Sequence, residues 1–208
     1  MYYKVLTADG KPCYGGVGQW HLANGQPGEW MPEIADIKPC ERGYHLCERG
    51  QLIHWLRGPT IWEAEGRGDF IRQDDKVVFA QARLLRPLPA WNERTARLFA
   101  CDCAERVLPI YAKCCPNDRR QANCIAVARR FANGEATHEE LAAARAAAAV
   151  VAAYAAVAAA RAAAFDAAFD AAWEAARAAA WDVAGDAAWD AAGEWQTERL
   201  FEYLKGKP

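Results

Sequence analysis

The chain has 208 residues, 53% of them hydrophobic, and a formal net charge of −2 at pH 7. This length allows one large or two small domains with real cores, and the nearly balanced charge gives no argument for a nucleic-acid binder or a polyanion mimic. No apolar run approaches the roughly 18 residues of a membrane span, and the first residues lack the pattern of a signal peptide. We therefore expect a cytoplasmic protein that does not enter a membrane.

Residues 1–86 are predicted to form a small mixed α/β domain, because short β-rich runs alternate with glycine and proline. The expected strands include residues 2–6, 61–65 and 76–85, and the expected short helix covers residues 51–56. The run at 76–85 is apolar on both faces over its first half, which is typical of a central strand.

A long glycine-rich loop follows the first expected strand and carries Trp20 and Trp30. Structureless loops of this length in compact domains are often functional, so a ligand could bind here. The alternative is a loop that its two tryptophans pin over the sheet, and the sequence leaves both interpretations open. The candidate binding residues of this domain are Trp20, Trp30, Tyr44 and His45.

The eight cysteines are expected to be free thiols, since the chain shows no secretory signal. Cys40, His45 and Cys47 lie within eight positions, and Cys13 could supply a fourth ligand to zinc. The spacing contains no CxxC pair, however, and a strand would place His45 and Cys47 on one face as core residues just as well. We expect no cofactor, and zinc at these four residues is the minor alternative.

The two prolines of the Arg86–Pro89 stretch resist both a helix and an internal strand, so residues 87–91 are predicted to be a linker. Residues 92–208 are then expected to form an alanine-rich bundle, with a capping box from Thr137 to Glu140 at the start of one helix. The predicted fold class is α+β: a small mixed α/β sheet domain followed by an all-α helical bundle.

Residues 165–194 repeat an aromatic, an acid and two small residues every four positions. On an α-helix a four-residue step leaves a drift of about 40°, so the aromatic stripe cannot face one partner throughout. We predict a break near Arg177 and two aromatic fans that form bundle core, each beside an acidic edge. The acidic candidate binding residues are Asp166, Asp170, Glu174, Asp182, Asp186 and Asp190.

Residues 98–134 resemble the opening of a family of immunity proteins whose members share an AERVLP…P.D.R…AI..AR…G pattern followed by an alanine-rich helical bundle. The residues that carry the resemblance are Asp102, Ala104, Glu105, Arg106, Val107, Leu108, Pro109, Pro116, Asp118, Arg119, Ile125, Ala128, Arg129 and Gly134. The resemblance implies a protein that acts by binding another protein.

Residues 1–86 resemble a small uncharacterised domain of bacteriophage and metagenomic proteins, through Lys4-Val5-Leu6, Pro27 to Trp30, Gly43 to Cys47 and Asp75 to Val78. More loosely, the strand–helix–strand layout is similar to ADP-ribosyltransferase-like folds. Because the catalytic glutamate of that fold has no match here, this second resemblance implies nucleotide binding rather than turnover.

These observations favour a non-enzymatic protein of phage or mobile-element origin that acts in bacterial defence or counter-defence. It would bind and inhibit a host protein, such as a nucleic-acid-processing defence enzyme, without contacting nucleic acid or a membrane, and its oligomeric state stays open. Two alternatives also stay open: a nucleotide-binding protein that uses the glycine-rich loop, and an acidic mimic of nucleic-acid phosphates.

Overall fold

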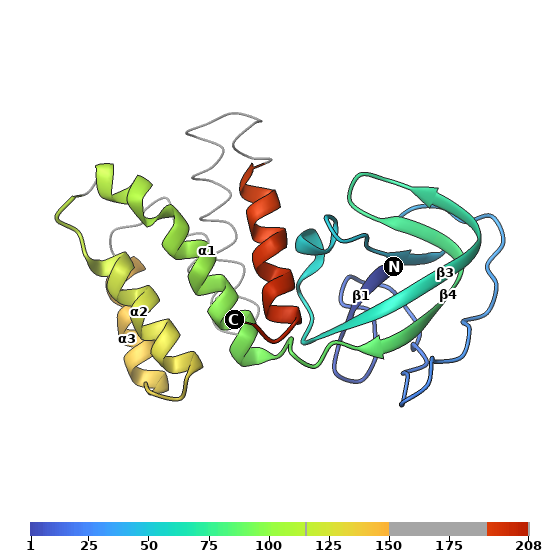
Figure 1. Ribbon diagram of the computed structural model, residues 1–208, viewed down its shortest axis with the longest axis horizontal. Coiled ribbons are helices and arrows are strands. Elements are labelled where there is room, and N and C mark those ends of the chain that lie inside the picture. The colour runs from blue at the N-terminus through green and yellow to red at the C-terminus, as the bar shows by residue number, and fades with distance from the viewer. Residues whose placement is uncertain (115, 150–190, 208) are drawn as a thin grey trace. The chain divides into compact units, whose positions relative to one another are not determined.

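The computed structural model describes residues 1–114, 116–149 and 191–207 (Figure 1). The chain divides into two compact units. The first unit consists of Met1–Asn92 together with Leu200–Lys207, and the second unit is Glu93–Arg199.

The first unit is built on an antiparallel sheet with the strand order β1-β3-β4-β2. Its strands are β1 (Tyr2–Leu6), β2 (Tyr44–Leu46), β3 (Thr60–Arg72) and β4 (Val77–Pro87). The long β3–β4 hairpin dominates the sheet in Figure 1, and the sheet curls into a half-barrel.

Two irregularities in the β3–β4 register accompany the curl, one between Glu63 and Ala64 and one between Arg67 and Phe70. Such bulges increase the local twist of a strand pair and bend it. The edges of the sheet then meet, because Tyr3 and the residue after β2, Cys47, exchange backbone hydrogen bonds of 2.8 and 2.9 Å. This bridge brings together two residues that are more than forty positions apart in the sequence.

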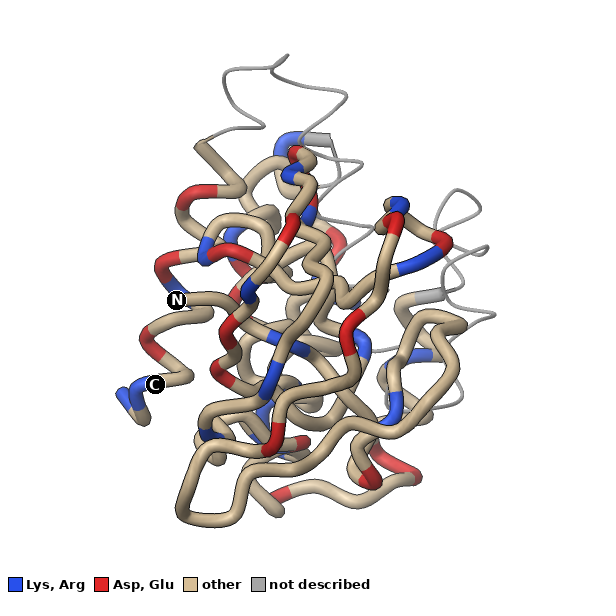
Figure 2. Tube along the Cα trace, turned by 90° about the vertical axis from the view of Figure 1, so that its right-hand side faces the viewer, with Lys and Arg blue, Asp and Glu red and all other residues tan. Residues whose placement is uncertain are grey.

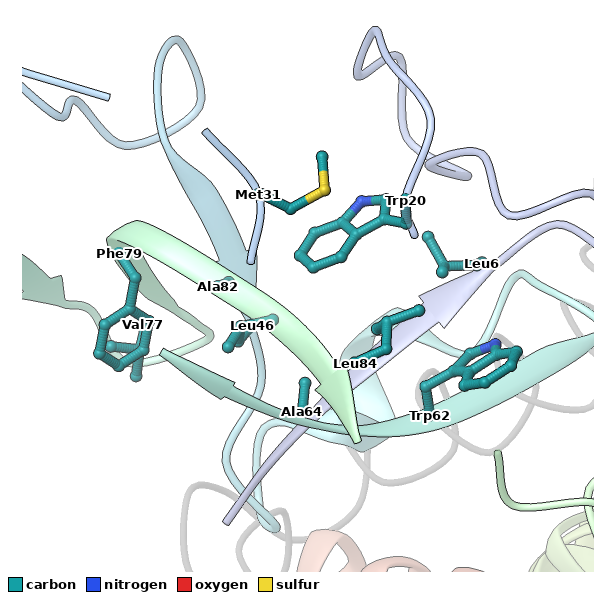
Figure 3. Close-up of a cluster of buried hydrophobic side chains, with 10 residues drawn as sticks. All are labelled: Leu6, Trp20, Met31, Leu46, Trp62, Ala64, Val77, Phe79, Ala82 and Leu84. Atoms are coloured by element: carbon teal, nitrogen blue, oxygen red, sulfur yellow. The ribbon is translucent and has the colours of Figure 1, made fainter. Parts of the chain in front are cut away.

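The core of the first unit lies on the inner face of the curled sheet. Figure 3 shows the Trp20 indole between Met31 and Leu6 and above Leu84. Trp20 and Met31 come from the glycine-rich segment rather than from a strand, so this segment supplies part of the core. The buried cluster comprises Leu6, Trp20, Met31, Leu46, Trp62, Ala64, Val77, Phe79, Ala82 and Leu84.

The second half of the glycine-rich segment follows the edge of β4 and is held there by backbone hydrogen bonds, without forming a strand of the sheet. The backbone N–H groups of Gly28, Met31 and Ile34 donate to carbonyl groups of every second residue of β4, at 2.8, 2.9 and 3.0 Å. These bonds satisfy the part of β4 that lies beyond the short strand β2. The segment is therefore held along its length, and Trp30 has a fixed position beside the sheet.

The predicted fold class is wrong in both of its parts. In the described residues of the first unit, the one helical element before residue 92 is the 3₁₀ turn Leu52–Trp55, so this unit is a curled antiparallel sheet and not a mixed α/β domain. The region from residue 92 onward is not an all-helical bundle, and Leu200–Lys207 belong to the first unit.

The reason for the second correction is the apolar end of the chain. Phe201 packs edge-on against Tyr3 of β1, with ring centroids 5.2 Å apart, and the Arg49 guanidinium carbon lies 3.9 Å from the centroid of the Phe201 ring. Leu200 and Tyr203 are also buried. Large apolar side chains gain most where other large side chains surround them, and the sheet core offers such partners.

The described part of the second unit contains α1 (Glu93–Cys114), α2 (Arg120–Ala132), α3 (His138–Ala149) and the helical residues 191–199. α1 packs on α2, and α2 packs on α3. The helix of residues 191–204 runs on into the first unit. Within the described ranges, no helix is long and apolar enough to cross a membrane.

The capping box predicted before α3 is confirmed. The Thr137 N–H donates to Glu140 Oε2 at 2.7 Å, and the Glu140 N–H donates to Thr137 Oγ1 at 3.2 Å. The two bonds satisfy donors that the first turn of a helix leaves open. The predicted break near Arg177 and the aromatic fans lie outside the described residues.

Candidate functional site

Trp20 serves the core of the first unit. Its side chain is 5% exposed, the Tyr44 ring lies edge-on to it with centroids 5.6 Å apart, and the Lys4 Nζ lies 5.2 Å from its ring. Burial lowers the pKa of Lys4, and its ammonium group donates to the His45 carbonyl at 2.9 Å. Trp20 thus pins the glycine-rich segment to the sheet.

Tyr44 and His45 are occupied by backbone groups. The Tyr44 hydroxyl donates to the Pro32 carbonyl at 2.8 Å. His45 Nε2 accepts from the Cys40 N–H at 2.9 Å, which leaves Nδ1 as the protonated nitrogen that faces the Gly43 carbonyl at 3.1 Å. Burial, with the nearby Lys4 ammonium, lowers the pKa of His45. The neutral imidazole therefore stabilises the turn at residues 40–45 through these two backbone contacts.

The four residues considered for zinc do not form a ligand cluster. Across residues 1–114, 116–149 and 191–207, no three His, Cys, Asp or Glu side chains come together closely enough to hold a metal ion. Cys13, Cys40 and Cys47 are not in disulfide bonds, and burial raises the pKa of Cys47 to about 12. A thiol with such a pKa stays protonated at neutral pH, whereas zinc binds the thiolate.

Trp30 lies beside two arginines on the face of the sheet opposite the core. The guanidinium carbons of Arg67 and Arg83 lie 4.0 and 4.7 Å from the centroid of its ring. Their flanking residues on the strands, Ala82 and Leu84 among them, point into the core, so strand alternation turns the arginines outward. We call Trp30, Arg67 and Arg83 the Trp30 site.

Neighbouring polar side chains fix the Trp30 site. Arg67 Nε donates to Gln81 Oε1 at 2.7 Å, and Gln81 Nε2 donates to the Met31 carbonyl at 3.1 Å. Arg83 pairs with Glu65, its partner across the strands. Among the described residues, no carboxylate lies within 4.0 Å of the Arg67 guanidinium. The site therefore carries one positive charge that Glu65 does not balance.

Trp30 is among the binding residues predicted from the sequence, whereas Arg67 and Arg83 are not. A signal was present, since charged or polar residues alternate with small residues in both strands: Glu65 and Arg67 in one, Gln81 and Arg83 in the other. The register that places these four side chains around Trp30 depends on the bulge in β3. The acidic candidates Asp166, Asp170, Glu174, Asp182, Asp186 and Asp190 lie outside the described residues.

The second unit contains a polar hub around Asp102 of α1. The Asp102 carboxylate accepts from Arg129 of α2 at 2.8 Å and from Arg199 of the last helix at 2.7 Å. Arg129 also donates to Glu105 at 2.7 Å. The Asp102 side chain is only 10% exposed, so the two guanidinium groups provide the polar partners that its charge requires. The hub connects three helices within this unit.

Asp102, Glu105 and Arg129 are among the residues that resemble an immunity-protein family, and the hub explains their pattern as a helix-to-helix connection. The family model described as Imm-5 like putative immunity protein matches residues 88–202, which is more than half of the chain. The chain belongs to this family. No curated protein and no solved structure matches the chain.

Proposed function

We propose that this chain is a non-enzymatic immunity-type protein that binds a partner protein and inhibits it. The family match over residues 88–202 carries the proposal. The finer role that fits the sequence is protection within bacterial defence or counter-defence, on a phage or mobile element, with a nucleic-acid-processing enzyme as the partner. A cytoplasmic location is part of this proposal.

The placement of the candidate residues supports a binder over a nucleotide-handling protein. Trp20 is buried in the core, and Tyr44 and His45 already bond backbone groups of their own domain. These residues therefore brace the first unit, and a nucleotide would have to displace them. By contrast, Trp30 and Arg67 face away from the core in a fixed arrangement. Partly exposed tryptophan and exposed arginine are common at protein interfaces.

The test separates inhibition by binding from inhibition by catalysis. Tagged protein is used to recover bound proteins, and the recovered partner is then purified and assayed with increasing amounts of this protein. A binder should abolish the partner's activity with an endpoint near one molecule per molecule, and dilution should restore activity at the rate of dissociation.

Two results would contradict the proposal. Complete inhibition by about one molecule per hundred of the partner would reveal an enzyme, because a tight binder is consumed as it acts. A partner that binds stoichiometrically and keeps its full activity would show a binding protein without an inhibitory role. The Asp102→Asn variant weakens the bonds of Asp102 to Arg129 and Arg199. Comparing its inhibition of the partner with that of the unaltered protein tests whether inhibition depends on the region that matches the family.

A further inference from the structure

The Trp30 site lies outside the region that matches the family, since the match begins at residue 88. Its central guanidinium is held from two sides. Arg67 Nε donates to Gln81 Oε1 at 2.7 Å, and the guanidinium carbon of Arg67 lies 4.0 Å from the centroid of the Trp30 ring. The Arg67 side chain loses its rotamer freedom in the free protein, so a ligand need not order it.

The two terminal nitrogens of Arg67 remain available. Within the described part of the chain, Arg67 makes its contacts through Nε and the flat face of the guanidinium group, and the residue itself is exposed. A guanidinium presents its two terminal N–H groups in a planar fork that matches the two oxygens of a carboxylate. The open end of this arginine therefore has the geometry of a carboxylate receptor.

The charge of the site points to the same ligand. Arg67 and Arg83 lie close to one indole ring, and Glu65 neutralises only Arg83. Two neighbouring cations with one anion leave a site that one more negative charge would balance. The Trp30 ring, which is partly exposed, adds apolar area next to this charge. Tryptophan and arginine together form the usual composition of an interface anchor.

A protein carboxylate fits better than a nucleic-acid backbone. Phosphate backbones are bound by tracks of several cations, whereas this site has one unbalanced arginine beside Glu65. Basic and acidic residues also interleave along the described trace instead of separating into a basic track (Figure 2). We propose that the Trp30 site is a docking point for an acidic segment of the partner protein, which places a carboxylate on the open end of Arg67.

This inference rests on the proposed function in taking the partner to be a protein, and it is tested with a defined probe. A blocked hexaglutamate peptide is titrated into the full-length protein at low salt, and the indole N–H signal of Trp30 is followed by NMR, with Trp30→Phe to assign it. The signal should shift in a saturable manner. In Arg67→Gln the peptide should bind at least about tenfold more weakly, as expected for loss of a bidentate charge-assisted pair.

The chain offers a matched control in Arg57, an exposed arginine of the same unit whose guanidinium carbon lies 5.5 Å from the centroid of the Tyr14 ring. Arg57→Gln removes the same charge from a similar arginine–aromatic pair and should leave peptide affinity within about twofold. Arg67→Lys keeps the charge but loses the fork, so it should also weaken binding. Hexaglutamine, which lacks the carboxylates, should not shift the Trp30 signal.

Three results would overturn the docking site: no saturable shift, equal weakening by Arg57→Gln and Arg67→Gln, or tighter binding of a single-stranded oligothymidylate at the same signal. The peptide measurement does not need the partner. A failure of peptide binding therefore leaves the proposed function standing, whereas a partner that is not inhibited, with peptide binding intact, removes the proposed function alone.

Discussion

Burial separates the chemistry of the cysteine thiols. Cys40 is exposed, in a backbone conformation with φ of 66°, whereas Cys47 is 7% exposed in the strand region that closes the sheet. Burial raises the pKa of Cys47 to about 12, and the nearby Lys4 ammonium only partly opposes this shift. In the second unit, burial likewise raises the pKa of Cys101 to about 11 and that of Cys103 to about 12.

We expect iodoacetamide at pH 8 to label Cys40 rapidly and to leave Cys47 and Cys103 unmodified in the folded protein. With a pKa of about 12, a thiol is ionised to only about one part in ten thousand at that pH, and it is also shielded from the reagent. Peptide mass spectrometry of labelled protein reads out each site. Equal labelling of Cys40 and Cys47 before unfolding would show that the closed edge of the sheet opens readily.

Gly66 lies under the Phe79 ring on the inner face of the sheet, where a Cβ would overlap the ring carbons. We expect Gly66→Ala to reduce the free energy of unfolding by about 1–3 kcal/mol, as overpacking of a filled core does. Gly50→Ala is the control, because no atom lies within 4 Å of the added methyl group. Urea denaturation measures both variants.

The contact with Phe79 is tested by a second substitution. In a Phe79→Leu background the ring is absent, so Gly66→Ala should cost clearly less than it does alone, a coupling expected only for residues in contact. Additive effects of the two substitutions would mean that the cost of Gly66→Ala comes from the backbone of β3 and not from the ring.

At the scale of elements, hydrogen bonds to β4 and side-chain ion pairs decide how segments are held. The segment around Met31 can hydrogen-bond to the edge of β4 because β2 covers only the first residues of β4. Glu63 of β3 and Arg86 of β4 are joined by two hydrogen bonds of 2.6 Å. In the second unit, the Asp102 hub joins helices in the same manner.

We expect Asp102→Ala to destabilise the second unit by roughly 2 kcal/mol, because Arg129 and Arg199 both lose their buried acceptor. The cost should stay below the roughly 3–5 kcal/mol of fully buried pairs, since the Arg129 and Arg199 side chains are 32% and 27% exposed and can be hydrated. Glu105→Ala is the matched control: its carboxylate pairs with the same Arg129 but is 49% exposed, so the cost should not exceed about 1 kcal/mol. Chemical denaturation followed by far-UV circular dichroism compares the two. Similar losses in the free energy of unfolding for the two variants would contradict the idea that the buried Asp102 carboxylate matters more than the exposed Glu105 carboxylate.

At the scale of the whole molecule, the last residues of the chain complete the first unit. Tyr203 is 1% exposed and Leu200 is fully buried, although both follow the alanine-rich region in sequence. The first unit therefore combines residues 1–92 with a segment that follows the second unit in sequence. Separation of the chain near residue 92 would remove this part from the unit.

We expect Tyr203→Ala to destabilise the first unit by about 3–5 kcal/mol, the usual cost of deleting a large buried aromatic side chain. Lys205→Ala, on the exposed side of the same tail, should change stability by less than about 0.5 kcal/mol. Limited proteolysis with mapped cleavage sites reports which unit loses protection. New cleavage confined to Glu93–Arg199 would contradict the assignment of the tail to the first unit.

The sequence by itself determined the features that arise from neighbouring residues. The capping box of Thr137 and Glu140 is readable because a cap depends on side chains three positions apart. The strand at 76–85 is readable from its apolar run, and the structure has β4 at Val77–Pro87. The immunity-family pattern is likewise local, and the family match over residues 88–202 agrees with it.

Only the tertiary structure decided the curl of the sheet, the place of the chain's end and the Trp30 site. Each depends on contacts between residues far apart in sequence: Tyr3 with Cys47, Phe201 with Tyr3, and Trp30 with Arg67. Alternation shows that Arg67 and its neighbours share a face, but the bulge in β3 and the pairing of residues 28–34 with β4 set which side chains meet there. These depend on how far the sheet bends, and the bend is a property of the whole sheet rather than of any single segment.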